Sequence, residues 1–538
     1  MNKFFTQLTK SRQLTDDYIH PKYENLENPT LLPDMDKALD RIEQAVKTDE
    51  KVLIYGDYDV DGVTSSTLME QALQMAGLPK IEVMLPDRFI DGYGMSERLI
   101  TRAKDQKITL VITVDCGSRN HAIIDELSQN NIDTIVTDHH ECEYVLPEAI
   151  AVINPHRHDY NGPEDLKNLA GVGVAFKLAQ GLAKRNLIKN GQEKWLLDLV
   201  LLGTICDSML LTKENRILTY FGKIVLEKTK REGLKELIKN AKTTKITSET
   251  IGFQLGPRLN AAGRLETAEI SLNLLRTNSA TEAAKLAGKL EELNHKRRTE
   301  QRTATSEIAE RLQKSEENTP VIIETGTWHE GIIGIVAGRL VEKYQKPAFV
   351  LTEVEDGIFK GSGRSFGDFN LAKALEYAKS AIEGGGGHAA AAGVQVKREN
   401  LYAFREKINE YYNSLNLKEQ DKFLKHHADI DIDSLKDFNL DLIEDLNQLE
   451  PFGPGNEEPI FCLKDAEIAD SRRMGQDGTH LRLDLKGKDG AVIKSVAFSA
   501  PDAWFHLYDD ELYDFLIQPT VNEWNGTRSV EARLLEVL

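Results

Sequence analysis

Short apolar runs alternate with helix-forming stretches through the first third of the chain. Runs with the length and β-branched content of buried strands lie at 52–55, 83–86, 109–114, 134–137 and 150–153. Apolar residues at helical spacing occupy the segments between them, at 65–75, 96–104 and 120–129. Strands that alternate with helices form βαβ units, which build a mainly parallel sheet. The pattern therefore predicts an α/β domain.

The rest of the chain divides by the same criteria. A mostly helical region, 166–241, is followed by a polar stretch, 280–317, with so few helix breakers that it predicts one long linking helix. A second, smaller α/β unit follows, with apolar runs and helices at 321–323, 332–344, 348–351 and 371–382. Short strands separated by Gly and Asp then predict a small β-barrel, from segments at 460–463, 479–485, 492–498, 515–519 and 529–535.

These patterns set expected boundaries. The α/β fold comprises a first domain, a linking helix, a smaller α/β domain and a terminal barrel, at 51–275, 276–318, 319–415 and 416–538. We expect residues 1–50 to pack on the first domain.

Composition excludes some classes of protein. The 538 residues are 41% hydrophobic and 28% charged, with a net charge of −19, which argues against coating nucleic acid through bulk charge. A local basic groove remains compatible with that total. The four cysteines form no CxxC pair, so free thiols in a reducing compartment are expected. The chain start lacks an apolar signal core, and we expect a cytoplasmic protein.

Acidic residues and histidines follow the ends of three predicted strands. Asp57, Asp59 and Asp61 come after the first strand, Asp115 follows the run at 109–114, and Asp138-His139-His140 follows the run at 134–137. Ligands of open parallel sheets bind beyond the carboxyl ends of the strands. We therefore expect these side chains to share one crevice.

So many carboxylates require cations or raised pKa values, because bare anions repel one another. Oxygen ligands with some imidazole suit Mn²⁺ or Mg²⁺, and two such ions about 4 Å apart can clamp a phosphate. Taken singly, the motifs have plainer interpretations: a calcium loop or acidic turn, a helix cap, and a surface histidine pair. Their shared position at strand ends favours catalysis.

The combination resembles the DHH phosphoesterase family, named for the triplet that stands here at 138–140. Segments 57–62, 114–117 and 202–207 resemble further motifs of that family, and the last adds Asp207. Residues 386–393 resemble the signature of the associated DHHA1 domain. Residues 256–264 and 450–456 resemble motifs of the family's bacterial exonuclease branch, the latter at the start of an OB-type barrel.

The resemblance implies a single-stranded-DNA-specific exonuclease that works 5′ to 3′ and releases mononucleotides in DNA repair and recombination. Two Mn²⁺ or Mg²⁺ ions would be held by Asp57, Asp59, Asp61, Asp115, His139 and Asp207. Asp115 would bridge them, His140 would donate to a phosphate oxygen, and Asp138 would orient the histidines.

DNA contacts are expected from phosphate-binding groups beside the site and from the barrel. Guanidinium, hydroxyl and imidazole groups, with glycines that allow close approach, make candidates of Arg258, Asn260, His329, Ser362, Arg364, Ser365, Gly387 and His388. The barrel would add local charge from Arg472, Arg473 and Arg482, and Trp504 and Trp524 either stack on bases or pack in the core or on the surface of the barrel. A single-strand-binding protein and a helicase are expected partners of a monomeric enzyme.

Two alternatives stay open. Small DHH–DHHA1 proteins resemble hydrolases of cyclic dinucleotides or very short oligonucleotides, and other relatives bind DNA without catalysis. The barrel and the 256–264 motif favour a long polymer, and the complete ligand set favours an enzyme. The acidic stretch 429–433 is interpreted as a solvated turn, with a partner contact as the alternative.

Overall fold

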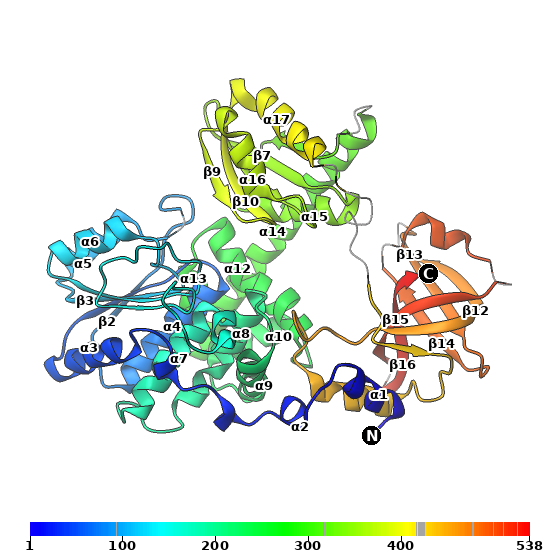
Figure 1. Ribbon diagram of the computed structural model, residues 1–538, viewed down its shortest axis with the longest axis horizontal. Helices are drawn as coiled ribbons and strands as arrows, with labels where there is room; N and C mark the ends of the chain where they lie inside the picture. The colour runs from blue at the N-terminus through cyan, green and yellow to red at the C-terminus, as the bar shows by residue number, and fades with distance from the viewer. Residues whose placement is uncertain are drawn as a thin grey trace.

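Three lobes make up the molecule, which is known here as a computed structural model (Figure 1). The structure describes residues 1–92, 94–315, 319–415, 417, 426–475, 478–498, 500–508, 511–524 and 526–538. The first lobe contains the predicted parallel sheet, the second stands above the long helix, and the third carries the C-terminus.

The first sheet has five strands in the order β2-β1-β3-β4-β5, and every pairing is parallel. Each strand overlaps a run predicted from the sequence: β1 Val52–Tyr55, β2 Ile81–Met84, β3 Leu110–Val114, β4 Asp133–Thr137 and β5 Ala151–Ile153. The order of the strands along the chain switches direction between β1 and β3, from β1 to β2 on one side and from β3 to β5 on the other, so the carboxyl ends of β1 and β3 form the crevice in which such sheets bind ligands.

Helices cover both faces of this sheet because alternate strand residues point to opposite sides. Leu53 and Val111 pack on one face against α5 Glu97–Asp105 and α6 His121–Gln129. Ile54 and Ile112 pack on the other against three helices, α3 Met35–Thr48, α4 Val60–Met75 and α7 Gly171–Lys184.

A helical region completes the lobe, comprising α8 Leu197–Cys206, α9 Lys213–Glu227, α10 Glu232–Asn240, α12 Gly256–Leu265 and α13 Glu269–Arg276. The predicted linking helix is α14, which runs from Ala280 to Lys314 over 35 residues. Ala283, Ala287 and Leu290 form its buried stripe, packed against the first lobe.

The second sheet is mixed, in the order β6-β7-β8-β10-β9. Its elements are β6 Ile322–Gly326, α15 Ile333–Tyr344, β7 Ala348–Glu355, β8 Ile358–Arg364, α16 Leu371–Tyr377, β9 Gly384–Gly387, β10 Ala391–Lys397 and α17 Leu401–Ser414. The pattern of apolar residues missed β8, β9 and β10, because their many glycines have low strand propensity.

The third lobe is a curled six-stranded sheet in the order β11-β12-β13-β14-β16-β15, with an additional β12–β15 pairing. Its strands are β11 Ile430–Ile432, β12 Phe461–Met474, β13 His480–Lys486, β14 Val492–Ala497, β15 Tyr513–Trp524 and β16 Thr527–Val537. The small β-barrel predicted from the sequence is therefore a curled sheet and not a closed barrel, and β14 and β16 pair over only two residue pairs. This partly open arrangement is usual in OB folds.

The N-terminal segment divides between two lobes. Helix α3 packs on the first domain, whereas α1 Lys3–Ser11 buries Phe4, Phe5 and Leu8 in the core of the third lobe. Arg12 then bonds both carboxylate oxygens of Asp429 at 2.6 and 2.8 Å, so this part of the acidic stretch is an internal contact and not a free turn. Among the described residues, no helix is both long and apolar enough to cross a bilayer.

Candidate metal centre and phosphate site

Three aspartates occupy the tight turn between β1 and α4. Asp59 caps α4, where its side chain accepts the amide of Gly62 at 3.0 Å. A Cβ on Gly62 would lie 2.4 Å from the carbonyl oxygen of Asp57, so this turn requires glycine. Asp57 and Asp61 are buried, and the three carboxylates gather at the carboxyl end of β1.

Asp115 follows β3 in a strained conformation, with φ at +61°. Left-handed backbone in a non-glycine residue is costly and gathers at functional sites. Its side chain is buried, and Oδ1 receives no well-directed hydrogen bond from the described part of the chain. A buried carboxylate oxygen left in this state needs a cation or a proton.

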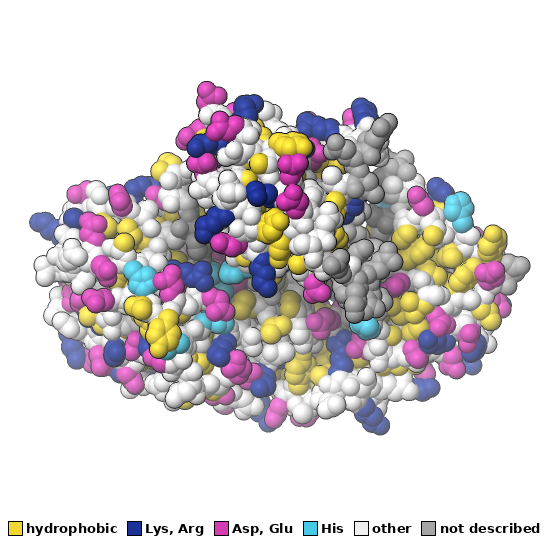
Figure 2. Space-filling view, turned by 45° about the horizontal axis from the view of Figure 1, so that its top comes forward, with side chains coloured by type: hydrophobic (Ala, Val, Ile, Leu, Met, Phe, Trp, Pro, Cys, Tyr) yellow, Lys and Arg dark blue, Asp and Glu magenta, His cyan; other side chains and the backbone are white. Residues whose placement is uncertain are grey.

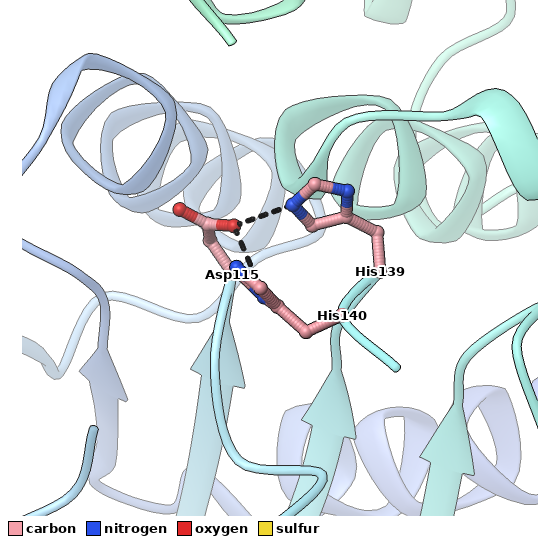
Figure 3. A group of neighbouring side chains, drawn as sticks. All are labelled: Asp115, His139 and His140. Atoms are coloured by element: carbon pink, nitrogen blue, oxygen red, sulfur yellow. Dashed lines mark ion pairs between the residues drawn. The ribbon is translucent and has the colours of Figure 1, made fainter. Parts of the chain in front are cut away.

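The two histidines point at Asp115 from the end of β4 (Figure 3). His139 Nε2 lies 3.2 Å from Asp115 Oδ1, and His140 Nδ1 lies 4.0 Å from the same atom. Asp138 turns away and accepts from the amides of Ser118, His139 and His140, and from His140 Nδ1 at 2.8 Å. These bonds tie Asp138 to the backbone of both histidines and to the ring of His140.

Asp207 reaches the same place from the end of α8. Its Oδ2 lies 3.6 Å from His139 Nε2, and Asp61 Oδ2 lies 3.9 Å from that nitrogen. Asp61 is fixed by the amides of Gly171 at 2.6 Å and Val172 at 3.0 Å, where α7 begins. The first turn of α7 therefore orients one of the carboxylates.

These residues have the donors and spacing of a metal centre. Three groups bring one ligand atom each within 4.8 Å of one another: Asp57, Asp59 and Asp115; Asp61, His139 and Asp207; Asp115, His139 and His140. Burial, together with the charge of Asp59, raises the pKa of Asp57 to about 8 and that of Asp207 to about 7. The pKa values of Asp61 and Asp115 are also raised by burial and neighbouring carboxylates. Divalent cations relieve this repulsion, so the residues fit a pair of them.

The two imidazoles differ in charge. Burial, with the neighbouring His140, lowers the pKa of His139 to about 4, so this ring is neutral and free to bind a metal. Although burial opposes it, the hydrogen bond that His140 Nδ1 donates to Asp138 raises the pKa of His140 to about 9. His140 is therefore a cation at neutral pH and can donate to an anion.

Arg88 and Arg264 stand near the carboxylates of the metal centre, and Arg364 stands near both of them. Burial and the charges of Arg88, Arg297 and Arg364 lower the pKa of Arg264 to about 9. Burial, then Arg88, also lowers the pKa of Arg364. Arg264 donates to the carbonyl of Gly331 at 3.2 Å, which joins α12 to the start of the second domain. Burial and mutual repulsion both disfavour the charged form of these guanidinium groups. Their position close together therefore indicates a site for a phosphate anion.

The predicted DNA contacts fall into two places. Arg364 Nη1 donates to Ser362 Oγ at 3.1 Å, and the β8–β10–β9 register places Ser365, Gly387 and His388 at the same end of the second sheet. His329 lies against Phe89 of the first domain with ring centroids 5.4 Å apart. Asn260 lies on α12, half-buried. Arg258 faces elsewhere and is held by Glu291 at 2.6 Å.

Arg258 lines a cleft of about 1470 Å³ between α12, α14, α15 and the third lobe. Its other basic residues include Arg297, Arg298, Arg302 and Arg339, and Phe253 stands 78% exposed at its edge. Figure 2 shows Lys and Arg intermixed with Asp and Glu over the visible face. A net charge of −19 is therefore compatible with a local basic cleft.

The sequence did not predict Arg88 or Arg264 as phosphate-binding residues. Arg264 ends a motif that the sequence singled out, but nothing distinguished its side chain from the others there. Arg88 stands in the loop after β2, with its guanidinium 5.1 Å from the ring of Tyr58, and has no motif around it. In the third lobe, Trp504 packs partly buried against the core, and the side chain of Trp524 lies outside the described residues.

Comparison with known proteins agrees with this arrangement. Three family models match: the DHH family N-terminal domain over 51–204, the DHHA1 domain over 318–414 and the RecJ OB domain over 429–536. The chain is 35% identical to the single-stranded-DNA-specific exonuclease RecJ of Bacillus subtilis, over 95% of this chain and 64% of that protein. It therefore spans about two thirds of that relative's length.

The RecJ protein of Dickeya dadantii is 32% identical, over 93% of this chain and 90% of its own length. Among solved structures, RecJ of Thermus thermophilus in complex with Mn²⁺ superposes with a TM-score of 0.84 at 27% identity, over 100% of this chain and 76% of that one. The same Thermus protein has also been solved with Mg²⁺.

Proposed function

The chain belongs to the RecJ family of DHH proteins, and on this premise we propose that it is a metal-dependent exonuclease specific for single-stranded DNA. One observation carries the proposal: buried carboxylates and a neutral histidine converge at one sheet edge, beside a group of arginines from both domains. A cation site next to a phosphate site is the requirement of phosphodiester hydrolysis.

The metal ligands are Asp57, Asp59, Asp61, Asp115, His139 and Asp207, which would hold two divalent ions, Mn²⁺ or Mg²⁺. Two ions so held supply a water of lowered pKa and neutralise charge on the phosphate. Asp115 belongs to two of the three groups of neighbouring ligand atoms, which supports a role in holding both ions.

His140 acts on the substrate through its charge. Its ring, kept protonated by Asp138, donates to a non-bridging phosphate oxygen and stabilises the charge that grows during attack. Asp138 is a positioning residue, since its carboxylate is occupied by three amides and that ring. Arg88, Arg264 and Arg364 hold the phosphate of the terminal nucleotide.

The cleft lined by Arg258, Arg297, Arg298, Arg302 and Arg339 extends the path of the DNA strand towards the third lobe. Its basic residues would follow the backbone, and Phe253 offers a base a stacking surface. Cleavage from the 5′ end to mononucleotides follows from the family resemblance, as do roles in repair and recombination. A single-strand-binding protein, a helicase, a monomeric state and a cytoplasmic location belong to the same proposal.

The test compares wild-type protein with Asp115→Ala on three substrates in Mn²⁺: a long single strand, its duplex and the dinucleotide pApA. Wild type should degrade the single strand and spare the duplex, and the folded variant should cleave nothing. Cleavage of pApA alone would favour a short-oligonucleotide hydrolase. An active Asp115→Ala protein would refute the assignment of these residues as the metal centre.

A further inference from the structure

Asp207 is held less firmly than the other aspartate ligands that are hydrogen-bonded or deeply buried. Within the described residues no hydrogen bond reaches the Asp207 carboxylate, and its side chain is 30% exposed, whereas Asp115, whose Oδ1 also lacks a hydrogen bond, is only 3% exposed. Asp61, by contrast, is fixed by two amides, and Asp57 and Asp59 by one each. The position of the Asp207 carboxylate therefore depends on its own backbone, at the point where α8 ends.

That backbone is a short loop, residues 207–212, with Ser208 at a φ of +57°. The amide of Leu211 donates at 2.7 Å to the carbonyl of Pro454, which belongs to the segment that leads into the third lobe. We call residues 450–456 the docking turn. A metal ligand thus stands four residues from a direct hydrogen bond to another lobe.

The docking turn is shaped to fit this loop. A Cβ on Gly453 would lie 2.7 Å from Leu211 Cδ1, and one on Gly455 would lie 3.0 Å from Thr212 Cγ2. Gly455 also has a φ of +75°, which favours glycine. The buried Asn456 closes the turn by donating to the carbonyls of Leu449 and Pro451, both at 2.8 Å.

Buried polar contacts fix the same interface from the other side. Arg216 of α9 is 1% exposed, and its guanidinium donates to the carbonyls of Glu450 at 2.6 Å and Gln448 at 3.0 Å. Asn215 is fully buried and donates to the carbonyl of Leu210 at 3.0 Å. The 207–212 loop is therefore held between α9 and the docking turn.

We propose that docking of the C-terminal lobe positions Asp207, so that the lobe completes the metal centre as well as binding DNA. The inference rests on the proposed function and assigns a role to the 450–456 motif. Because coupling is reciprocal, bound metal should in turn strengthen the docking.

The test measures Mn²⁺ binding without DNA, by electron paramagnetic resonance of the free ion. Gly455→Ala and Gly453→Ala should weaken one of two bound ions by about fivefold or more, the lower range of such couplings. Gly490→Ala is the matched control, because Gly490 lies in the same lobe with a φ of +76° and nothing within 4 Å of its Cβ position. It should bind Mn²⁺ as the wild type does, and all variants should bind single strands normally in EDTA.

Amide exchange gives a second readout that needs no variant. Mn²⁺ should slow exchange of the Leu211 amide in the wild-type protein, since that group donates across the interface. Unchanged exchange with bound Mn²⁺, normal Mn²⁺ affinity in both docking-turn variants, or an equal loss in Gly490→Ala would overturn the inference. A wild type that binds two ions but cleaves no strand would refute the nuclease and leave this coupling intact.

Discussion

Replacing Gly171 by alanine should damage catalysis without weakening the helix that contains it. Gly171 is the first residue of α7, and its amide holds Asp61. A Cβ there would lie 2.6 Å from both Cβ and Oδ1 of Asp115, whereas ordinary contacts begin near 3.4 Å. The side chain of Asp115 must therefore move by roughly 1 Å, and such a displacement can lower a rate by about 10²-fold.

The helix propensity of alanine favours the folded helix, whereas its Cβ disturbs Asp115, so an effect on stability can be told apart from an effect on catalysis. Alanine is favoured over glycine in helices by up to about 1 kcal/mol, so α7 itself should not unfold. The rate loss corresponds to about 2.7 kcal/mol of transition-state stabilisation. Gly173→Ala is the control: it lies on the same helix, and the three atoms nearest its Cβ would all belong to the side chain of Leu169, beginning at 3.0 Å.

The assay is single-turnover cleavage of a labelled single strand in saturating Mn²⁺, with urea unfolding as the check on stability. We expect Gly171→Ala to lose about 10²-fold in rate and Gly173→Ala to stay near wild type. A Gly171→Ala protein with wild-type rate would refute the placement of Asp115 at the reacting centre. Equal losses in both variants would mean that packing of α7 limits the rate.

Three further predictions concern DNA affinity and stability. Arg364→Ala should weaken single-strand binding in EDTA and reduce the slope of log affinity against log salt by about 0.7, and an unchanged slope would place Arg364 away from the phosphates. Arg473 lies 4.2 Å from the ring of Phe505 in the third lobe, so Arg473→Ala should lower affinity for long strands more than cleavage of pApA, and equal losses would contradict a strand-binding role. Burial, with Asp59, raises the pKa of Asp57 to about 8, so without metal this group destabilises the fold increasingly as pH rises from the ordinary Asp range to 8. Urea unfolding in EDTA should therefore show an advantage of Asp57→Asn over wild type that grows from pH 5 to pH 8 and reverses when Mn²⁺ is added; an advantage that shrinks with pH would contradict the shift.

Periodicity of apolar residues was sufficient for the first domain. The strands of its sheet lie within two residues of the predicted runs, because a doubly covered sheet buries both faces of each strand and leaves a continuous hydrophobic signal. The same reasoning placed Asp57, Asp115 and His139 in one crevice, since the carboxyl ends of parallel strands share an edge.

Other features could not be derived this way. Asp207 ends a helix, so only the family resemblance selected it. Strands β8 and β9 are glycine-rich, and the only apolar alternation in β10 is the short run Ala392, Val394 and Val396. Arg88 and Arg264 meet Arg364 only through the packing of two domains, and α1 reaches the third lobe across more than 400 residues of sequence, as the bond from Asn2 to the carbonyl of Asp437 illustrates. Contacts of that kind leave no local pattern.

The most direct test of the account uses one long single-stranded oligonucleotide, labelled at either its 5′ or its 3′ end, in Mn²⁺ and in EDTA. The account predicts immediate release of the 5′ label as a mononucleotide and progressive shortening of the 3′-labelled strand, both abolished by EDTA. Early release of the 3′ label, internal cuts, or cleavage that persists in EDTA would contradict it.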